Sequence, residues 1–398
     1  MAGCKMLKEA DLPLETAILL IAGMTMLIAG ILLFPVASGR LPFYEDGFFG
    51  LLLVMFSLQI ITLGKTPFGD VHRSKKLLTV GVAIAAMGIV TSFIPEFSGR
   101  IPRALLVLSF GPGGFILLLQ MLFSRKKFRA WLRYGGVFRH LIVGCLMVYF
   151  LSMMIAILIL ENSLLTVPLA AMTVMFYGVA IIYLAGVLRR IYGMYPEAEK
   201  YHDSDVGIST EQLMLLLMAV FMVILGILII PVNLGMLPFS GSAQLGLLMV
   251  MFAIQMLASG STPIGAFSRS WLMVLLGLVF AAMGIVSCMI PGVLVSFLTV
   301  FVGILNILGG IIPLAKRFVP RKIGKEQKQG EIPPIVKRLF ATQVGLNLLG
   351  ILFGVSMLVS WLLPGVVIGL ILAGNGCVLF YLLHILIDLE KMRCDATK

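Results

Sequence analysis

Residues 30–43 read GILLFPVASGRLPF, and residues 226–239 read GILIIPVNLGMLPF. The two stretches lie 196 positions apart, and the same offset carries the match to residues 95 and 291 without a gap, with 31 of 66 pairs identical. The identical pairs include Pro, Gln, Arg and Gly at fixed places, whereas two unrelated apolar segments would share mainly leucines. The chain therefore contains an internal duplication.

The composition is that of a membrane protein. Apolar residues make up 60% of the chain and charged residues 12%, whereas about a quarter of the residues in soluble proteins are charged. Runs of about 20 apolar residues match the thickness of a bilayer, and in hydrocarbon such runs must be helices. The sequence therefore predicts an all-α polytopic protein with twelve transmembrane helices. They are expected near residues 16–36, 47–64, 77–95, 103–123, 141–160, 166–188, 212–232, 243–260, 271–290, 294–315, 340–362 and 365–387.

The basic residues predict the orientation of these helices. With the amino terminus placed inside, 27 of the 30 Lys and Arg fall in the inner loops. The positive-inside rule then predicts a multi-pass protein of the cytoplasmic membrane with both termini in the cytoplasm. Six spans per half is an even number, so both halves enter the membrane in the same sense. We expect two parallel six-helix repeats related by a pseudo-twofold axis along the membrane normal.

The expected boundaries follow from the spans. The net charge of +12 is placed as membrane orientation requires, so nucleic acid is not an expected partner. The basic clusters at residues 125–129 and 316–322 either contact anionic headgroups of the lipid bilayer or serve only to set the topology. The predicted segments are a cytoplasmic amino terminus (1–15), a first transmembrane repeat (16–190), a cytoplasmic linker (191–211), a second transmembrane repeat (212–387) and a cytoplasmic tail (388–398).

Small residues recur on the third helix of each half at spacing i, i+4, i+7. They are Gly81, Ala85 and Gly88 in the first half and Gly277, Ala281 and Gly284 in the second. Small residues let helices approach closely in lipid. The pattern predicts a contact face between helices.

Two glutamines are the most notable polar residues inside the spans. Gln59 and Gln255 are equivalent in the duplication, and a buried amide without a partner costs several kcal/mol. Two interpretations are open. The amides face one another across the pseudo-axis and line a substrate pathway, or each bonds a neighbouring carbonyl and fixes the packing.

A second candidate is the motif Thr-Pro-x-Gly-x-x-x-Arg-Ser, which follows the second span of each half. Thr66 and Thr262 precede proline, which suits a turn, and Arg73 and Arg269 are able to reach a phosphate at the membrane interface. The motif therefore predicts either a substrate-binding loop or a turn preserved by the duplication.

Catalytic chemistry is not expected. The spans contain no acidic or basic residue deep in the hydrocarbon, where proton relays and coupled pumps normally need one. The histidines and cysteines lack metal-ligand spacing, and no phosphate-binding glycine loop or nucleophile elbow is present. We therefore expect a protein that is not an enzyme and has no metal and no cofactor.

The exits Gly30-Ile31-x-x-x-Pro35 and Gly88-Ile89-x-x-x-x-x-Pro95, each followed by an apolar helix, resemble those of the HdeD-type acid-resistance membrane proteins. Residues 24–64, 82–123 and 145–186 look like three helical hairpins of that family, here in a tandem fusion of two units. The resemblance implies a stress-related or scaffold role with dry packing around the two glutamines. The alternative is a small-molecule or lipid transporter with its site between the two repeats.

Overall fold

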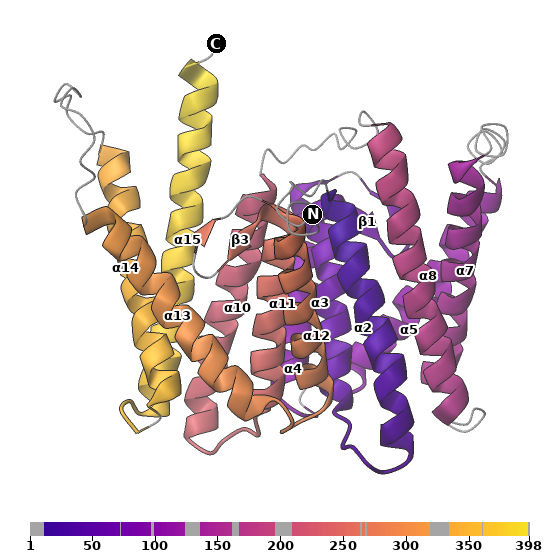
Figure 1. The fold of residues 1–398 in the computed structure, drawn as a ribbon, viewed down its shortest axis with the longest axis horizontal. Helices are drawn as coiled ribbons and strands as arrows, with labels where there is room; N and C mark the ends of the chain where they lie inside the picture. The colour runs from indigo at the N-terminus through magenta and orange to yellow at the C-terminus, as the bar shows by residue number, and fades with distance from the viewer. Residues whose placement is uncertain are drawn as a thin grey trace, which may run out of the picture. The chain divides into compact units, whose positions relative to one another are not determined.

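The structure is a computed structural model that describes residues 12–71, 73–96, 99–123, 136–160, 167–195, 209–262, 265–266, 269–318, 334–359 and 361–396. Among these residues, twelve helices are long and apolar enough to cross a membrane (Figure 1). The chain is therefore an integral, multi-pass membrane protein. In the first half the helices are α2 (Leu14–Ala37), α3 (Glu45–Leu63), α4 (Lys75–Phe93), α5 (Ile101–Phe123), α7 (Val137–Leu160) and α8 (Val167–Met194). In the second half they are α10 (Thr210–Asn233), α11 (Gly241–Ser259), α12 (Trp271–Met289), α13 (Val295–Phe318), α14 (Pro334–Leu358) and α15 (Gly365–Ala396).

Two short β-hairpins interrupt the helical pattern, and the all-α prediction did not include them. Strand β1 (Lys65–Thr66) pairs with β2 (Gly69–Asp70), and β3 (Ser261–Thr262) pairs with β4 (Gly265–Ala266). Each pairing turns through a glycine with positive φ, +135° at Gly69 and +146° at Gly265, which a residue with a side chain rarely adopts. The repeated Thr-Pro-x-Gly motif therefore forms a hairpin between two helices.

The described chain forms two compact units. The first contains α2, α3, α4, α5, α7 and α8 together with α11 and α12, and the second contains α10, α13, α14 and α15. The domain boundaries expected from the duplication stay a prediction. Residues 1–11 of the amino terminus, residues 196–208 of the linker and most of the two basic clusters lie outside the described residues.

The predicted small-residue face lies in a tight helix contact. A β-carbon at Gly50 of α3 would lie 2.4 Å from the carbonyl oxygen of Gly88 of α4. The equivalent helices α11 and α12 repeat the contact, since a β-carbon at Gly246 would lie 2.5 Å from the carbonyl oxygen of Gly284. The backbones meet so closely that no side chain fits between them, which confirms the prediction that small residues form a contact face.

The expected pairing of helices in hairpins is wrong for the first two hairpins of the half, because α2 packs little on α3 and α4 packs little on α5. Helix α2 packs mainly along α8, the last helix of the half, and α3 packs along α4. Glycines decide this choice, because a β-carbon at Gly178 of α8 would lie 2.7 Å from the carbonyl oxygen of Gly23 of α2. In the second unit α10 packs along α15 through the same kind of contact, where a β-carbon at Gly376 would lie 2.9 Å from the carbonyl oxygen of Ala219.

Two backbone hydrogen bonds join segments far apart in the chain within the first unit. The N–H of Tyr44 donates to the carbonyl oxygen of Met289 at 2.8 Å, and the N–H of Ser240 donates to that of Phe93 at 2.9 Å. Tyr44 and Ser240 are 196 positions apart, as are Phe93 and Met289. The start of the second helix in each half is therefore bonded to the end of the third helix of the other half.

Candidate functional site

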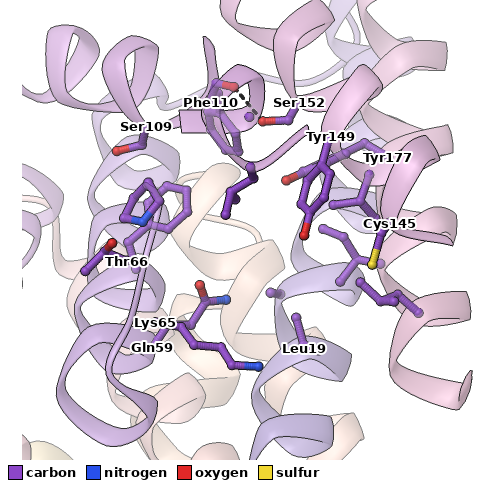
Figure 2. Close-up of a pocket in the computed structure, with 18 of the residues that line it drawn as sticks. Leu19, Gln59, Lys65, Thr66, Ser109, Phe110, Cys145, Tyr149, Ser152 and Tyr177 are labelled. Carbon is purple, nitrogen blue, oxygen red and sulfur yellow. Dashed lines mark hydrogen bonds between the residues drawn. The ribbon is translucent and has the colours of Figure 1, made fainter. Parts of the chain in front are cut away.

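A cavity of about 690 Å³ lies inside the first half of the chain. Its walls come from α2, α3, α5, α7 and α8 and from the β1–β2 hairpin. Figure 2 shows Gln59 and Lys65 on one side of this cavity and Tyr149, Tyr177 and Cys145 on the other. Its volume is within the range of about 300–1,000 Å³ typical of small-molecule sites.

The cavity extends from one end of the helices to their middle. On each of four helices the lining begins near the end beside the hairpin and covers twelve or thirteen positions, which is eleven or twelve residue steps. At 1.5 Å per residue this corresponds to ~17 Å, about half of a 30 Å hydrocarbon core. The lining intervals are Glu15–Met26 on α2, Ser109–Met121 on α5, Leu141–Ser152 on α7 and Tyr177–Leu188 on α8.

Aromatic rings surround the inner end of the cavity. The ring of Phe110 lies edge-on to that of Phe56 at 5.2 Å between centroids and to that of Tyr177 at 5.9 Å. The hydroxyl of Ser152 donates to the carbonyl oxygen of Phe110 at 2.7 Å and ties α7 to α5 at this level. This end therefore presents rings with few open hydrogen-bonding groups.

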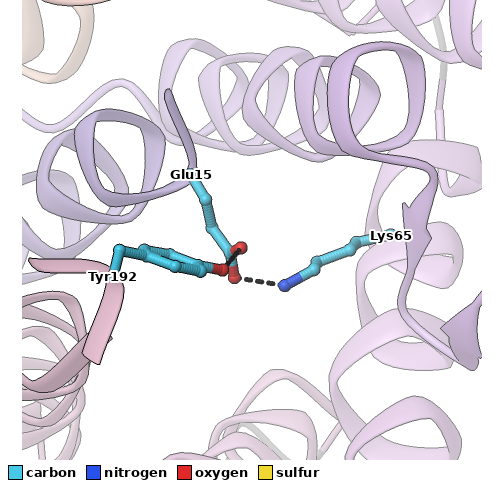
Figure 3. A network of polar contacts seen from close by, with 3 residues as sticks. All are labelled: Glu15, Lys65 and Tyr192. Atoms are coloured by element: carbon cyan, nitrogen blue, oxygen red, sulfur yellow. Dashed lines mark hydrogen bonds and ion pairs between the residues drawn. The ribbon is translucent and has the colours of Figure 1, made fainter. Parts of the chain in front are cut away.

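A polar cluster occupies the opposite end, beside the hairpin. The carboxylate of Glu15 forms an ion pair with the ammonium group of Lys65 and accepts a hydrogen bond of 2.6 Å from the hydroxyl of Tyr192 (Figure 3). Glu15 is only 6% exposed although it lies in the first turn of α2. The cluster joins α2, β1 and α8 at the hairpin end of the cavity.

The sequence does not predict this cluster. Glu15 falls in the expected amino-terminal segment and Lys65 in an expected inner loop, as charges outside the apolar runs. The two partners of Glu15, Lys65 and Tyr192, lie 50 and 177 positions away in the chain, so no local spacing identifies the cluster. An acidic residue at the first turn of an apolar helix was the one available signal, and that position is equally common for an exposed carboxylate.

Gln59 and Gln255 have different surroundings. Gln59 lines the cavity, and among the described residues its side-chain amide has no hydrogen-bond partner. Gln255 is not part of the lining, and its main-chain carbonyl oxygen accepts a hydrogen bond from the Ser259 hydroxyl at 2.9 Å. The structure thus places one of the two amides in a cavity and does not bring both into it.

The two threonines of the repeated motif have a structural role. The Thr66 hydroxyl donates to the carbonyl oxygen of Gly69 at 2.8 Å, and that of Thr262 donates to the carbonyl oxygen of Gly265 at 2.7 Å. Each hydroxyl therefore closes its own hairpin. Thr66 also lines the cavity. It contributes surface there, but its hydroxyl proton is already donated to the carbonyl oxygen of Gly69.

The two arginines of the motif do not line the cavity. The Arg269 guanidinium donates to the carbonyl oxygen of Leu12 and, at 2.9 Å, to that of Leu257. This arrangement holds the segment before α2 against the end of α11. The Arg73 side chain lies against Gly64 at the end of α3, and burial lowers the pKa of its guanidinium. Both arginines therefore act as packing groups between helices and loops.

The serine that ends the motif caps the next helix. Ser74 Oγ accepts from the N–H of Leu77 at 3.3 Å, and Ser270 Oγ accepts from that of Met273 at 3.3 Å. Capping satisfies one of the free N–H groups at a helix start. The motif as a whole is thus a helix stop, a hairpin and a helix start, and structural needs explain its preservation in both halves.

The remaining polar lining comes from the hairpin and α5. The Gln120 amide donates to the carbonyl oxygen of Phe68 at 3.0 Å and fixes the hairpin turn against α5. Asp70 of β2 also lines the cavity, and no ion pair of its carboxylate is found among the described residues. The part of the chain that the structure describes holds no cluster of three or more His, Cys, Asp or Glu suited to a metal ion.

Comparisons of the chain with protein-family models, with curated proteins and with solved structures find no match. The cavity and its lining are therefore the basis for assigning a function. The cavity has an aromatic inner end, the Gln59 amide on one wall and charged groups at the hairpin end.

Proposed function

We propose that this protein is a membrane transporter of a small amphipathic molecule, with its binding site inside the first six-helix repeat. The chamber of about 690 Å³ that extends to the middle of the helices carries this proposal. A pathway that is open from one end and closed at mid-membrane is what alternating access requires of one of its two states. The role needs no catalytic residue, and we keep the expectation of a non-enzymatic protein within the proposal.

The position of Gln59 favours transport over the HdeD-like stress-related or scaffold role. A scaffold interpretation expects dry packing around this amide, because in a bundle a polar side chain normally bonds a neighbouring helix. Gln59 instead lines the cavity. The site also differs from the one expected for a transporter, since all of its lining comes from one half of the chain and not from both.

The proposal includes two parallel repeats related by a pseudo-twofold axis. The two backbone hydrogen bonds from Tyr44 to Met289 and from Ser240 to Phe93 support it, because a twofold axis relates each donor to the other donor and each acceptor to the other acceptor. We further propose, from the distribution of Lys and Arg, that the chain lies in the cytoplasmic membrane with both termini inside. In that orientation the hairpin end of the cavity opens to the cytoplasm, and the basic loops contact anionic headgroups.

The test uses single cysteines in a chain whose five native cysteines are replaced by alanine. Ser152→Cys places a thiol at the inner end of the cavity, and Ser57→Cys places one on a fully buried position of α3 outside it. In sealed proteoliposomes of known orientation, a small charged methanethiosulfonate reagent should modify the first thiol and leave the second unmodified.

The side of the membrane from which the reagent modifies the thiol distinguishes the candidate functions. For a transporter, the thiol at position 152 reacts quickly from the cytoplasmic side and more slowly from the other side, because the site alternates between them. A binding protein without transport gives reaction from one side only. If this thiol is as unreactive as the Ser57→Cys control from both sides, the packing is dry and the scaffold role is correct.

A further inference from the structure

The charges and rings of the cavity identify the class of its ligand, an inference that rests on the transport site proposed above. Two carboxylates and one ammonium group line the cavity. Lys65 is paired with Glu15 and stands opposite Asp70 in the β1–β2 pairing, so among the described lining residues one carboxylate is in excess. A cavity whose described lining carries one more negative than positive charge attracts cations and repels anions.

The rings that line the cavity suit a cation as well. They are Phe56, Phe110, Tyr149 and Tyr177, contributed by four different helices. The face of an aromatic ring attracts a cation through its quadrupole, with a gain of about 0.5–2 kcal/mol that is largest where water is excluded. Rings can also serve only to fill a core, so the question is whether the fold needs them.

Helix α14 of the second half shows that the fold does not need an aromatic ring at the position that Tyr149 occupies on α7. A β-carbon at Gly114 of α5 would lie 3.2 Å from the carbonyl oxygen of Tyr149. In the second half, a β-carbon at Gly310, which is 196 positions after Gly114, would lie 2.5 Å from the carbonyl oxygen of Asn347. Asn347 therefore holds the place on α14 that Tyr149 holds on α7.

Helix α15 gives the same result for the wall made by α8. Gly178 packs on Gly23, and Gly376 packs on Ala219, which is equivalent to Gly23. The residues just before these two glycines are therefore equivalent. Three ring positions of the first half thus carry asparagine in the second. Phe110 corresponds to Asn306, 196 positions later, whereas by these helix contacts Tyr149 corresponds to Asn347 and Tyr177 to Asn375, each 198 positions later.

We infer that the cavity binds a monovalent organic cation with an apolar, ring-bearing body. The same helix positions accept a small amide in the other half, so helix packing does not require rings there and the rings serve a ligand. The body of the cation lies among the rings at the inner end, and Asp70 balances its charge from the hairpin. The Gln59 amide supplies a hydrogen-bonding group between them.

The experiment compares two probes of the same shape and opposite charge, tetraphenylphosphonium and tetraphenylborate. Binding to the full chain in phosphatidylcholine nanodiscs is measured by calorimetry, with empty nanodiscs subtracted. The phosphonium is expected to bind at least about tenfold more tightly than the borate, a ratio equivalent to 1.4 kcal/mol. Asp70→Asn should reduce this preference by about the same factor, while Glu45→Gln, an exposed carboxylate that does not line the cavity, should leave it unchanged.

The ring variants use residues already present in the second half. Phe110→Asn and Tyr149→Asn are expected to weaken phosphonium binding by about tenfold each, and thermal unfolding of each variant shows whether it is folded. Equal affinity for both probes, or phosphonium binding unaffected by the Asp70 and ring variants, would overturn the cation inference and leave the transport site in place. Absence of binding of either probe, together with an unreactive thiol in Ser152→Cys, would overturn both.

Discussion

The hydroxyl of Tyr192 donates to the carboxylate of Glu15 at 2.6 Å across 177 positions of the chain. Because Glu15 is 6% exposed, its charge is stable only with partners, which here are this hydroxyl and the ammonium group of Lys65. The contact fixes the end of α8 to the start of α2 at the hairpin end of the cavity. The cluster therefore helps to determine how these two helices pack.

Replacing one charge of this cluster should destabilise the protein. Glu15→Gln leaves Lys65 without its counter-ion, and we expect a loss of about 1–3 kcal/mol, which is moderate because the lysine is partly exposed. The melting temperature of the purified protein in detergent measures the effect. Glu211→Gln is the matched control, since this equivalent glutamate is exposed and should tolerate the change. The double variant Glu15→Gln with Lys65→Gln should recover part of the loss, and a double variant as unstable as the single one would contradict the pairing argument.

The close contact of α3 with α4 predicts a strong effect at one glycine. Gly50→Val adds carbons where the carbonyl oxygen of Gly88 already lies 2.4 Å from the first of them. The helices must separate, and we expect a loss of about 3 kcal/mol or more, seen as a lower melting temperature or failed expression. In contrast, Gly186→Ala on α8 has no atom within 4 Å of the new carbon. That variant should be neutral or stabilised by up to about 1 kcal/mol. Similar stability of the two variants would show that the α3–α4 contact is looser than described.

The parallel arrangement of the halves is testable with a matched pair of cysteines. Ser38 and Leu234 are 196 positions apart, and both are exposed residues just after the first helix of a half. In a chain without its native cysteines, a membrane-impermeant maleimide added outside should label Ser38→Cys and Leu234→Cys equally. Labelling of only one of them in intact cells would mean that the halves have opposite orientations.

Arg269 should contribute to stability and not to ligand binding. Its guanidinium donates to the carbonyl oxygens of Leu12 and Leu257, and the side chain does not line the cavity. Arg269→Ala leaves two acceptors without a donor, so we expect a loss of about 2 kcal/mol with unchanged affinity for tetraphenylphosphonium. Arg190→Ala removes an exposed arginine and should change neither quantity. Weaker phosphonium binding by a fully folded Arg269→Ala protein would restore the binding role that the motif suggested.

The sequence was a good guide to elements whose cause is local. Each transmembrane helix must be long and apolar enough by itself to cross the hydrocarbon core, so its position can be read from the local sequence. The expected span 47–64 accordingly agrees with α3 at Glu45–Leu63 within a few residues. The small-residue face of α4 was predictable for the same reason, since spacing along one helix decides which residues share a face. The duplication added evidence, because a pattern found twice is unlikely to arise by chance.

The site depends on contacts that spacing does not encode. Glu15, Lys65 and Tyr192 come together only because α2 packs along α8 and the hairpin folds back beside them. Preservation between the halves was also a poor indicator of function. The motif of Thr66 and Arg73 is repeated since it builds a turn, whereas Tyr149 has no aromatic equivalent and lines the cavity.

The exchanged hydrogen bonds between Tyr44 and Met289 and between Ser240 and Phe93 involve only main-chain atoms. A single six-helix copy carries one donor and one acceptor of this kind, so two separate copies would self-associate through the same pair as a symmetric homodimer. Because neither bond uses a side-chain atom, most substitutions at these four positions leave the donors and acceptors in place. Gene fusion of an ancestral dimer would thus preserve its interface while the two copies came to differ at the cavity positions, with aromatic residues in one and amides in the other.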